Sequence, residues 1–207
     1  MTHECCYFAM VGPPASGKGT QGRFLADKLG VAYLSTGARL RREIEEGSSL
    51  GLRAKEFLDA NQYVPDSLAD ELVHSWVLRH DDGWMLDGFP RSAPQAEALL
   101  DFSPQPFKVI HLSVPTEELR SRVTTRRECL SCGASSTSEH QVCPQCGSSE
   151  LGARADDSTE GFEKRLQAYE SLTIPALELL QSRTEVVTID GIGTREEIAQ
   201  KIQNQLS

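Results

Sequence analysis

Hydrophobic and polar positions follow two distinct rhythms along the chain. Short apolar runs bounded by turn residues predict buried strands at residues 7–11, 31–34, 84–86, 109–114 and 186–189. Segments with helical spacing of apolar side chains lie between or after them, at residues 18–29, 67–79, 94–100, 116–126 and 194–206. This alternation predicts an α/β fold of three layers, in which helices cover both faces of a parallel five-stranded sheet.

Two segments break this rhythm and predict insertions. Residues 35–64 are charged and helix-like, and they contain no strand pattern. Residues 127–157 are poor in large apolar side chains and rich in Cys, Ser, Gly and Gln, so they lack the material for an ordinary core. We therefore expect one core domain, formed by residues 1–34, 65–126 and 158–207, that carries both insertions.

The composition narrows the class of protein. Of the 207 residues, 39% are hydrophobic and 25% are charged, which is typical of a globular chain with one sizeable core. The sequence has no run of eighteen apolar residues, and its N-terminus resembles no signal peptide, so we expect a cytoplasmic protein. The net charge of −9 disfavours general binding to nucleic acid or to an anionic membrane.

A phosphate-binding loop is predicted between the first strand and the first helix. Residues 12–20 read Gly-Pro-Pro-Ala-Ser-Gly-Lys-Gly-Thr, a P-loop pattern in which the lysine follows the second glycine. Backbone N–H groups of such a loop surround phosphate oxygens, and the helix N-terminus adds a favourable dipole. Lys18 is expected to bridge the β- and γ-phosphates, and Thr20 to offer its hydroxyl to Mg²⁺.

Further groups suited to a nucleotide phosphate lie at the ends of predicted elements. Asp87 directly follows a strand, at the edge where open parallel sheets bind ligands, and it is expected to hold Mg²⁺ directly or through water. Guanidinium groups fork onto phosphate oxygens and stay charged, so arginines at element ends predict a polyphosphate clamp. These arginines are Arg41, Arg91, Arg122, Arg126, Arg154 and Arg165.

Five motifs, in order along the chain, resemble those of the adenylate kinase family. They are residues 12–21, Ser35-Thr-Gly-x-x-x-Arg41, Asp87-Gly-Phe-Pro-Arg91-x-x-x-Gln95, Arg122-x-x-x-Arg126-Arg127 and Arg154-Ala-Asp156-Asp157. The resemblance runs from about residue 7 to residue 205. It implies the reaction ATP + AMP ⇌ 2 ADP with Mg²⁺, a part in nucleotide homeostasis and a monomer. It also implies a mobile AMP-binding insertion at residues 35–64 and a mobile lid at residues 127–157.

The resemblance also assigns roles to individual residues. ATP would be bound by Ala15, Ser16, Gly17, Lys18, Gly19, Thr20, Arg126 and Gly193. AMP would be bound by Thr36, Arg41, Gln62, Tyr63, Val64, Gly88, Phe89, Pro90, Arg91, Gln95, Arg154 and Arg165. Phosphoryl transfer would be stabilised by Lys18, Arg91, Arg126, Arg154 and Arg165, without a protein nucleophile or general base. Asp156 and Asp157 would help to close the lid.

Thr36 and Gln95 are implied to surround the adenine of AMP. A side-chain amide can pair with the donor and acceptor edge of that base, so this pair favours AMP over a pyrimidine monophosphate. Two positions depart from the family pattern. Ala38 replaces the usual Asp, which removes a polar contact from the AMP insertion, and Ala15 replaces a glycine of the loop. The change at Ala15 is small if its φ stays negative.

Four cysteines predict a metal site in the lid. Cys129 and Cys132 form one C-x-x-C pair, Cys143 and Cys146 form another, and ten residues separate the pairs. This spacing lets four thiolates bind one tetrahedral Zn²⁺, which would be structural because a complete shell leaves no open position. The alternatives are two disulfides, a redox pair, or iron or cobalt in the same shell.

Other functions remain open at this stage. Within the class, a UMP/CMP kinase is the main alternative, and the donor triphosphate is not restricted to ATP by a backbone contact at Gly193. A nucleotide-gated module that uses its zinc ribbon to bind RNA or protein belongs to another class. Residues 128–152 contain no Lys, Arg or aromatic residue, which disfavours that module.

Overall fold

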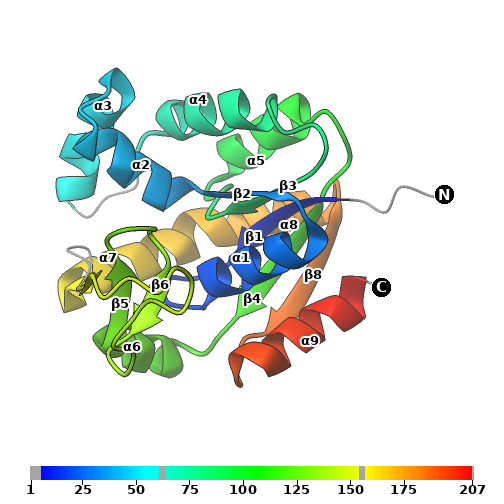
Figure 1. The fold of residues 1–207 in the computed structure, drawn as a ribbon. Coiled ribbons are helices and arrows are strands. Elements are labelled where there is room, and N and C mark those ends of the chain that lie inside the picture. Colours follow the sequence, from blue (N-terminus) through cyan, green and yellow to red (C-terminus); the bar gives the residue numbers. More distant parts are fainter. Residues whose placement is uncertain (1–5, 61–63, 154–156, 207) are drawn as a thin grey trace.

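A five-stranded sheet forms the centre of the computed structural model, which describes residues 6–60, 64–153 and 157–206 (Figure 1). Its strands are β1 Tyr7–Val11, β2 Ala32–Ser35, β3 Trp84–Asp87, β4 Lys108–Ser113 and β8 Glu185–Asp190. Their order is β2-β3-β1-β4-β8, and every neighbouring pair is parallel. The predicted α/β fold with a parallel five-stranded sheet is therefore confirmed.

Helices cover both faces of this sheet. On one face α1 Lys18–Leu29 and α9 Arg195–Leu206 pack through Leu25, Ile198 and Ile202. On the other face lie α4 Asp66–Val77, α5 Ala93–Phe102 and α8 Ile174–Gln181, which bury side chains such as Leu72 and Leu99. Burial on both faces explains why the strands read as continuous apolar runs.

The remaining elements lie toward the carboxyl ends of the strands. They are α2 Thr36–Glu45, α3 Ser49–Asp59, α6 Thr116–Thr125, α7 Thr159–Ala168 and the π-helix η2 Tyr169–Thr173. A second, antiparallel sheet is formed by β5 Arg126–Cys129, β6 Ser135–Thr137 and β7 Leu151–Gly152, in the order β6-β5-β7. Among the described residues, no helix is both long and apolar enough to cross a membrane.

Two parts of this architecture were not predicted. Helices α7, η2 and α8 had no counterpart in the predicted elements, because the π-helical turn at 169–173 shifts the phase of the apolar positions. The strands of the small sheet span four, three and two residues, which is too short for an alternating pattern.

Candidate functional site

The phosphate loop lies at the carboxyl edge of the sheet, between β1 and α1. Gly17 is the N-cap of α1 with φ 90°, and the Lys18 ammonium donates a hydrogen bond to the Pro13 carbonyl at 3.1 Å. Gly19 follows the lysine, where many phosphate loops carry Ser or Thr. A Cβ at Gly19 would lie 3.0 Å from Asp87 Oδ2, so a larger residue there would require the Asp87 carboxylate to shift.

The condition of a negative φ at Ala15 is not met. Its φ is +63°, in the left-handed region that glycine adopts far more readily than alanine. The loop must turn here so that its N–H groups face one centre, whatever side chain is present. Ala15 is buried in a hydrophobic cluster with Val114, Leu119 and Val123, and burial of its methyl group offsets part of the backbone strain.

Lys18 and Asp87 form the charged centre of the loop. Burial lowers the pKa of Lys18 to about 7; Asp87 acts in the opposite direction, and Arg91, Arg126 and Arg165 lower the pKa further. Asp87 Oδ2 accepts a hydrogen bond from the Tyr33 hydroxyl at 2.8 Å. Asp87 Oδ1 is buried without a hydrogen-bond partner among the described residues, so this oxygen is suited to a cation or to a water molecule bound to it.

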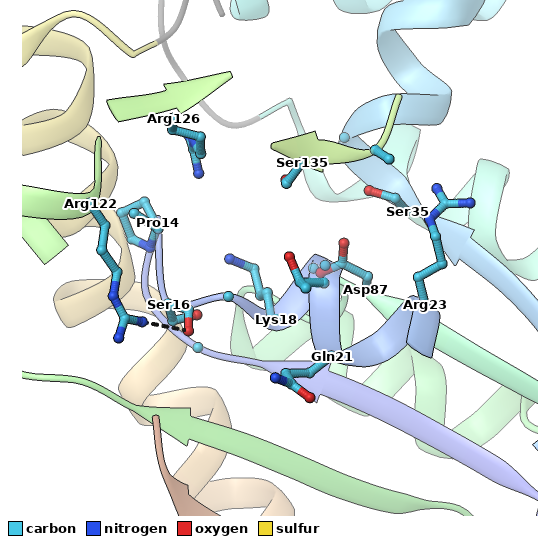
Figure 2. Close-up of a pocket in the computed structure, with 18 of the residues that line it drawn as sticks. Pro14, Ser16, Lys18, Gln21, Arg23, Ser35, Asp87, Arg122, Arg126 and Ser135 are labelled. Atoms are coloured by element: carbon cyan, nitrogen blue, oxygen red, sulfur yellow. Dashed lines mark hydrogen bonds between the residues drawn. The ribbon is translucent and has the colours of Figure 1, made fainter. Parts of the chain in front are cut away.

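Three of the predicted arginines converge on this centre. Figure 2 shows Arg126 reaching from β5 toward Lys18 across the cavity. Its Nε donates to Asp157 Oδ2 at 2.6 Å, and Arg165 Nη2 donates to Asp157 Oδ1 at 2.8 Å. Arg91 Nε donates to the Gly88 carbonyl at 2.6 Å. Asp157 therefore holds two of these guanidinium groups together, next to the phosphate loop.

Arg122 has a different role in the structure. It donates to the Ser16 carbonyl at 3.3 Å, the contact drawn in Figure 2, and to the Gly191 carbonyl at 2.9 Å. It thus fastens the phosphate loop to the segment after β8. An arginine at a helix end carries no sequence signal for such bracing, because its target lies 106 residues away in the chain.

The residues expected around AMP occupy two kinds of position. Arg41 on α2 lies in the cavity, where its Nη2 is 2.5 Å from Glu128 Oε1 on β5. Thr36 is buried, and its hydroxyl has no hydrogen-bond partner within the described part of the chain. Gln95 is also buried, and its amide contacts Asp66 and the backbone of Arg91.

Most of the predicted site residues line one cavity of about 700 Å³. It is lined by Ala15, Ser16, Gly17, Lys18, Gly19, Thr20, Arg41, Asp87, Gly88, Pro90, Arg91, Arg126, Arg165 and Gly193. Thr36, Phe89 and Gln95 are buried and do not line this cavity, and Val64 lines a smaller cavity that shares Arg91. Gln62, Tyr63, Arg154 and Asp156 lie outside the described residues.

The cavity lies between three parts of the chain: the phosphate loop, α2 and the small sheet. Gly133, Ala134 and Ser135 close it on the side of the small sheet. Ala38 on α2 lies close to this sheet, since a Cβ at Gly133 would be 3.5 Å from the Ala38 Cβ. The volume and the cationic lining suit two ligands that carry phosphate groups.

The four predicted metal ligands converge in the small sheet. The sulfur atoms of Cys129, Cys132, Cys143 and Cys146 all lie within 4.8 Å of one another. The Cys129–Cys146 and Cys132–Cys143 sulfur pairs are 3.6 and 3.7 Å apart, too far for disulfide bonds. A zinc tetrahedron with bonds of about 2.3 Å has edges of about 3.8 Å. The donor set therefore fits one tetrahedral metal ion.

A bound cation would change the ionisation of the cysteine cluster. Burial raises the pKa of Cys132 to about 12, and the three neighbouring thiols act in the same direction. Without a cation, this group therefore stays protonated at neutral pH. Among the described residues, Ala134 and Leu151 are the apolar side chains that pack in this cluster, so a bound ion would supply much of the local stability.

Four positions that shape the site have no assigned role in the sequence-based hypothesis. They are Tyr33, Asp66, Glu128 and Thr173. Each forms a hydrogen bond with a residue distant in sequence. Tyr33 donates to Asp87, and Asp66 accepts from Gln95. Glu128 accepts from Arg41, and Thr173 donates to the Arg91 carbonyl. The sequence offered one hint of these roles, which was location: Tyr33 and Asp66 lie near element ends, beside recognised motifs.

Comparison with known proteins gives a consistent result. The sequence profile described as "Adenylate kinase" matches residues 10–185. The adenylate kinase of Methanocella arvoryzae is 38% identical over 95% of this chain and 96% of its own length. Those of Caldicellulosiruptor saccharolyticus and Alkaliphilus oremlandii are 37% and 38% identical, over 92% and 88% of this chain and 92% and 89% of theirs.

Proposed function

The chain belongs to the adenylate kinase family and transfers a phosphoryl group between ATP and AMP, and on this premise we propose how its residues divide that task. Residues 15–20, together with Arg126 and Gly193, bind ATP. Support comes from the shared cavity, from the loop N–H groups at the start of α1, and from the buried Lys18 ammonium.

AMP binds on the side of α2 and of the loop after β3. Its phosphate is held by Arg41, Arg91, Arg154 and Arg165, and its base lies near Thr36, Gln95 and the stretch 62–64. The backbone of residues 88–90 completes the contact. Support comes from Arg41, Gly88, Pro90, Arg91 and Arg165, which line the same cavity as the phosphate loop.

Transfer requires alignment and neutralised charge. A phosphate oxygen of AMP is already nucleophilic, so the protein needs neither a nucleophile nor a general base. Lys18, Arg91, Arg126, Arg154 and Arg165 stabilise charge that develops on the transferred group. Arg126 and Arg165 share Asp157 in the structure, so this carboxylate keeps both guanidinium groups in place until a phosphate competes for them.

Two metal ions belong to the proposal. Mg²⁺ enters with ATP and neutralises phosphate charge; Asp87, through its unpartnered oxygen, and Thr20 are the residues that fit it. Structural Zn²⁺ is bound by Cys129, Cys132, Cys143 and Cys146, whose sulfur spacing fits a tetrahedral ion.

The domain division is proposed as core 1–34, 65–126 and 158–207, AMP-binding insertion 35–64 and lid 127–157. The separate antiparallel sheet supports the assignment of the lid, and the helix pair α2 and α3 supports that of the insertion.

We place the protein in the cytoplasm as a monomer. Free thiols that serve as metal ligands need a reducing compartment, and the family resemblance favours a monomer.

One observation carries the proposal: a single cavity joins the phosphate loop to the arginine group from α2, β5, α7 and the loop after β3. The direct test is to incubate the protein with Mg²⁺ and ADP alone and to separate the nucleotides over time. We expect ATP and AMP in equal amounts. AMP with free phosphate, or no reaction, would refute the assignment, and a panel of other monophosphates would then identify the acceptor.

A further inference from the structure

The side-chain amide of Gln95 is held in one orientation. Its Nε2 donates to Asp66 Oδ1 at 2.7 Å, and its Oε1 accepts from the backbone N–H of Arg91 at 2.8 Å. A backbone N–H can only donate, and a carboxylate can only accept. The nitrogen and oxygen ends of this amide are therefore assigned by chemistry, whereas most glutamine amides can exchange them.

Two helix starts build this arrangement. Asp66 is the first residue of α4, and its Oδ2 accepts from the Ser92 hydroxyl at 2.8 Å. Ser92 is the N-cap of α5, where its oxygen also accepts from the Gln95 backbone N–H at 3.3 Å. Ser92 and Gln95 are 7% and 3% exposed, so water competes little for these contacts. Hydrogen bonds to a carboxylate are also stronger than neutral ones.

A fixed amide presents a fixed pattern to a ligand. Among the described residues, the two contacts leave Gln95 one N–H and one carbonyl lone pair for a base. Adenine offers an amino donor at position 6 and an acceptor at N1, whereas hypoxanthine and guanine offer an oxygen acceptor and an N–H donor. An amide that is free to flip pairs with either pattern. In the orientation fixed by Asp66 and Arg91, the Gln95 amide pairs with the adenine pattern and meets hypoxanthine or guanine with donor facing donor and acceptor facing acceptor.

We propose that Asp66 is a specificity-determining positioning residue, which fixes the polarity of the Gln95 amide and so makes the acceptor site select 6-amino over 6-oxo purine monophosphates. The inference rests on the proposed function, in which Gln95 meets the base of AMP. IMP is the sharpest probe, because it differs from AMP only at position 6 and in the proton on N1.

The test compares kcat/KM for AMP and for IMP with ATP as donor. Asp66→Asn keeps the size and shape of the side chain. The new amide can turn either its oxygen or its nitrogen toward Gln95, so the orientation of the Gln95 amide is no longer fixed. Asp70→Asn is the matched control, because it removes a carboxylate one turn further along α4, and none of the Gln95 hydrogen bonds described above goes to Asp70. Gln95→Ala tests the proposed base contact itself, and thermal unfolding checks that each variant is folded.

We expect the preference for AMP over IMP to fall roughly 5- to 150-fold in Asp66→Asn, the range for one bidentate base contact, and to stay unchanged in Asp70→Asn. If Gln95→Ala lowers the preference but Asp66→Asn does not, the role of Asp66 is refuted while the base contact stands. If Gln95→Ala leaves the preference unchanged, the proposed placement of AMP fails instead.

A substrate analogue tests the orientation of the Gln95 amide in the unmodified protein. Purine riboside 5′-monophosphate keeps the N1 acceptor but has no group at position 6. A fixed Nε2–H donor still pairs with its N1, so we expect an order of kcat/KM in which AMP exceeds this analogue and the analogue exceeds IMP. IMP used as well as the analogue would show that the amide turns freely, and the proposal would fall.

Discussion

At the scale of single residues, the buried ammonium of Lys18 is the most unusual group. Burial holds its pKa at about 7, well below the usual value near 10.5. A buried amine of this kind is largely neutral above pH 7 until an anion arrives. Negative phosphate oxygens beside it favour the charged form and raise the pKa again.

Binding of ATP is therefore expected to take up a proton at alkaline pH. At pH 8 the free protein holds Lys18 about nine-tenths neutral, and the bound form holds it charged, so uptake approaches about one proton per ATP. At pH 6 both forms are charged and uptake falls toward zero. Calorimetry of Mg-ATP binding in buffers with different ionisation enthalpies measures this number. Lys18→Met should abolish it, and a value near zero at pH 8 would contradict the assignment.

Arg126 is expected to act on the transition state more than on the fold. Its removal leaves Asp157 paired with Arg165, so folding stays intact. The loss of one charge-stabilising donor corresponds to a roughly 100- to 1000-fold fall in kcat. Steady-state kinetics of Arg126→Ala, and equally of Arg91→Ala, check this. Arg120→Ala is the control, because Arg120 pairs with Glu163 on the surface. Near-normal activity of Arg126→Ala would remove this residue from the chemistry.

The sequence was informative about residues whose chemistry is local. The phosphate loop, Asp87 and the cysteine pairs could be found because each motif is contiguous or evenly spaced. The positive φ of Ala15 could not be foreseen, since an alanine in the sequence gives no signal for the left-handed region. Asp66 and Glu128 were not found, because their partners are set by the packing of distant elements.

At the scale of elements, the small sheet depends on its cysteines. Its buried cluster consists of Cys129, Ala134 and Cys143, with Cys132 and Leu151 beside it. Three strands of four, three and two residues give little stability without further support. The scarcity of apolar residues in this segment led to the prediction of a lid built around a metal site. Its strands were not predicted, because they are too short to show an alternating pattern.

Removal of the metal is expected to unfold this element first. A strong chelator should lower stability by at least about 2 kcal/mol, or about 5 °C in the thermal midpoint for a chain of this size. Hydrogen exchange should speed up in residues 127–152 while the five-stranded sheet stays protected. Zn²⁺ added afterwards should restore both. Unchanged exchange in 127–152 would mean that the cysteines do not hold the element.

A second prediction at this scale concerns the ion pair between α2 and β5. Arg41 pairs with Glu128, so an AMP phosphate must compete with that carboxylate for the guanidinium group. Glu128→Gln removes the competing charge and is expected to lower KM for AMP about fivefold, with KM for ATP unchanged. Glu163→Gln, in the surface pair with Arg120, is the control. A higher KM for AMP would instead mean that the pair holds the lid closed during turnover.

At the scale of the whole molecule, the small sheet lies close to both other parts of the site. Besides the Arg41–Glu128 pair, Gln145 donates to Asp27 on α1 at 3.3 Å. These contacts bridge the lid to α2 and to the core. A cavity covered in this way restricts water, which would otherwise accept the phosphoryl group in place of AMP.

Phosphate release from ATP without AMP is therefore expected to stay below about one-hundredth of the transfer rate, and to rise when the lid is loosened by metal removal. A phosphate-release assay with and without chelator measures it. A leak that is already large in the metal-loaded protein would contradict the idea that this cover excludes water.

The order of the strands has a consequence for how the protein is made. β1, which leads into the phosphate loop, pairs with β3 and β4, and β4 needs β8 at its other side. Arg122 ties Ser16 to Gly191, just beyond β8. On the ribosome, the loop emerges well before its last brace at Gly191, which is synthesised some 175 residues after Ser16. A nascent chain therefore carries an incomplete nucleotide site until β8 and the segment after it have emerged.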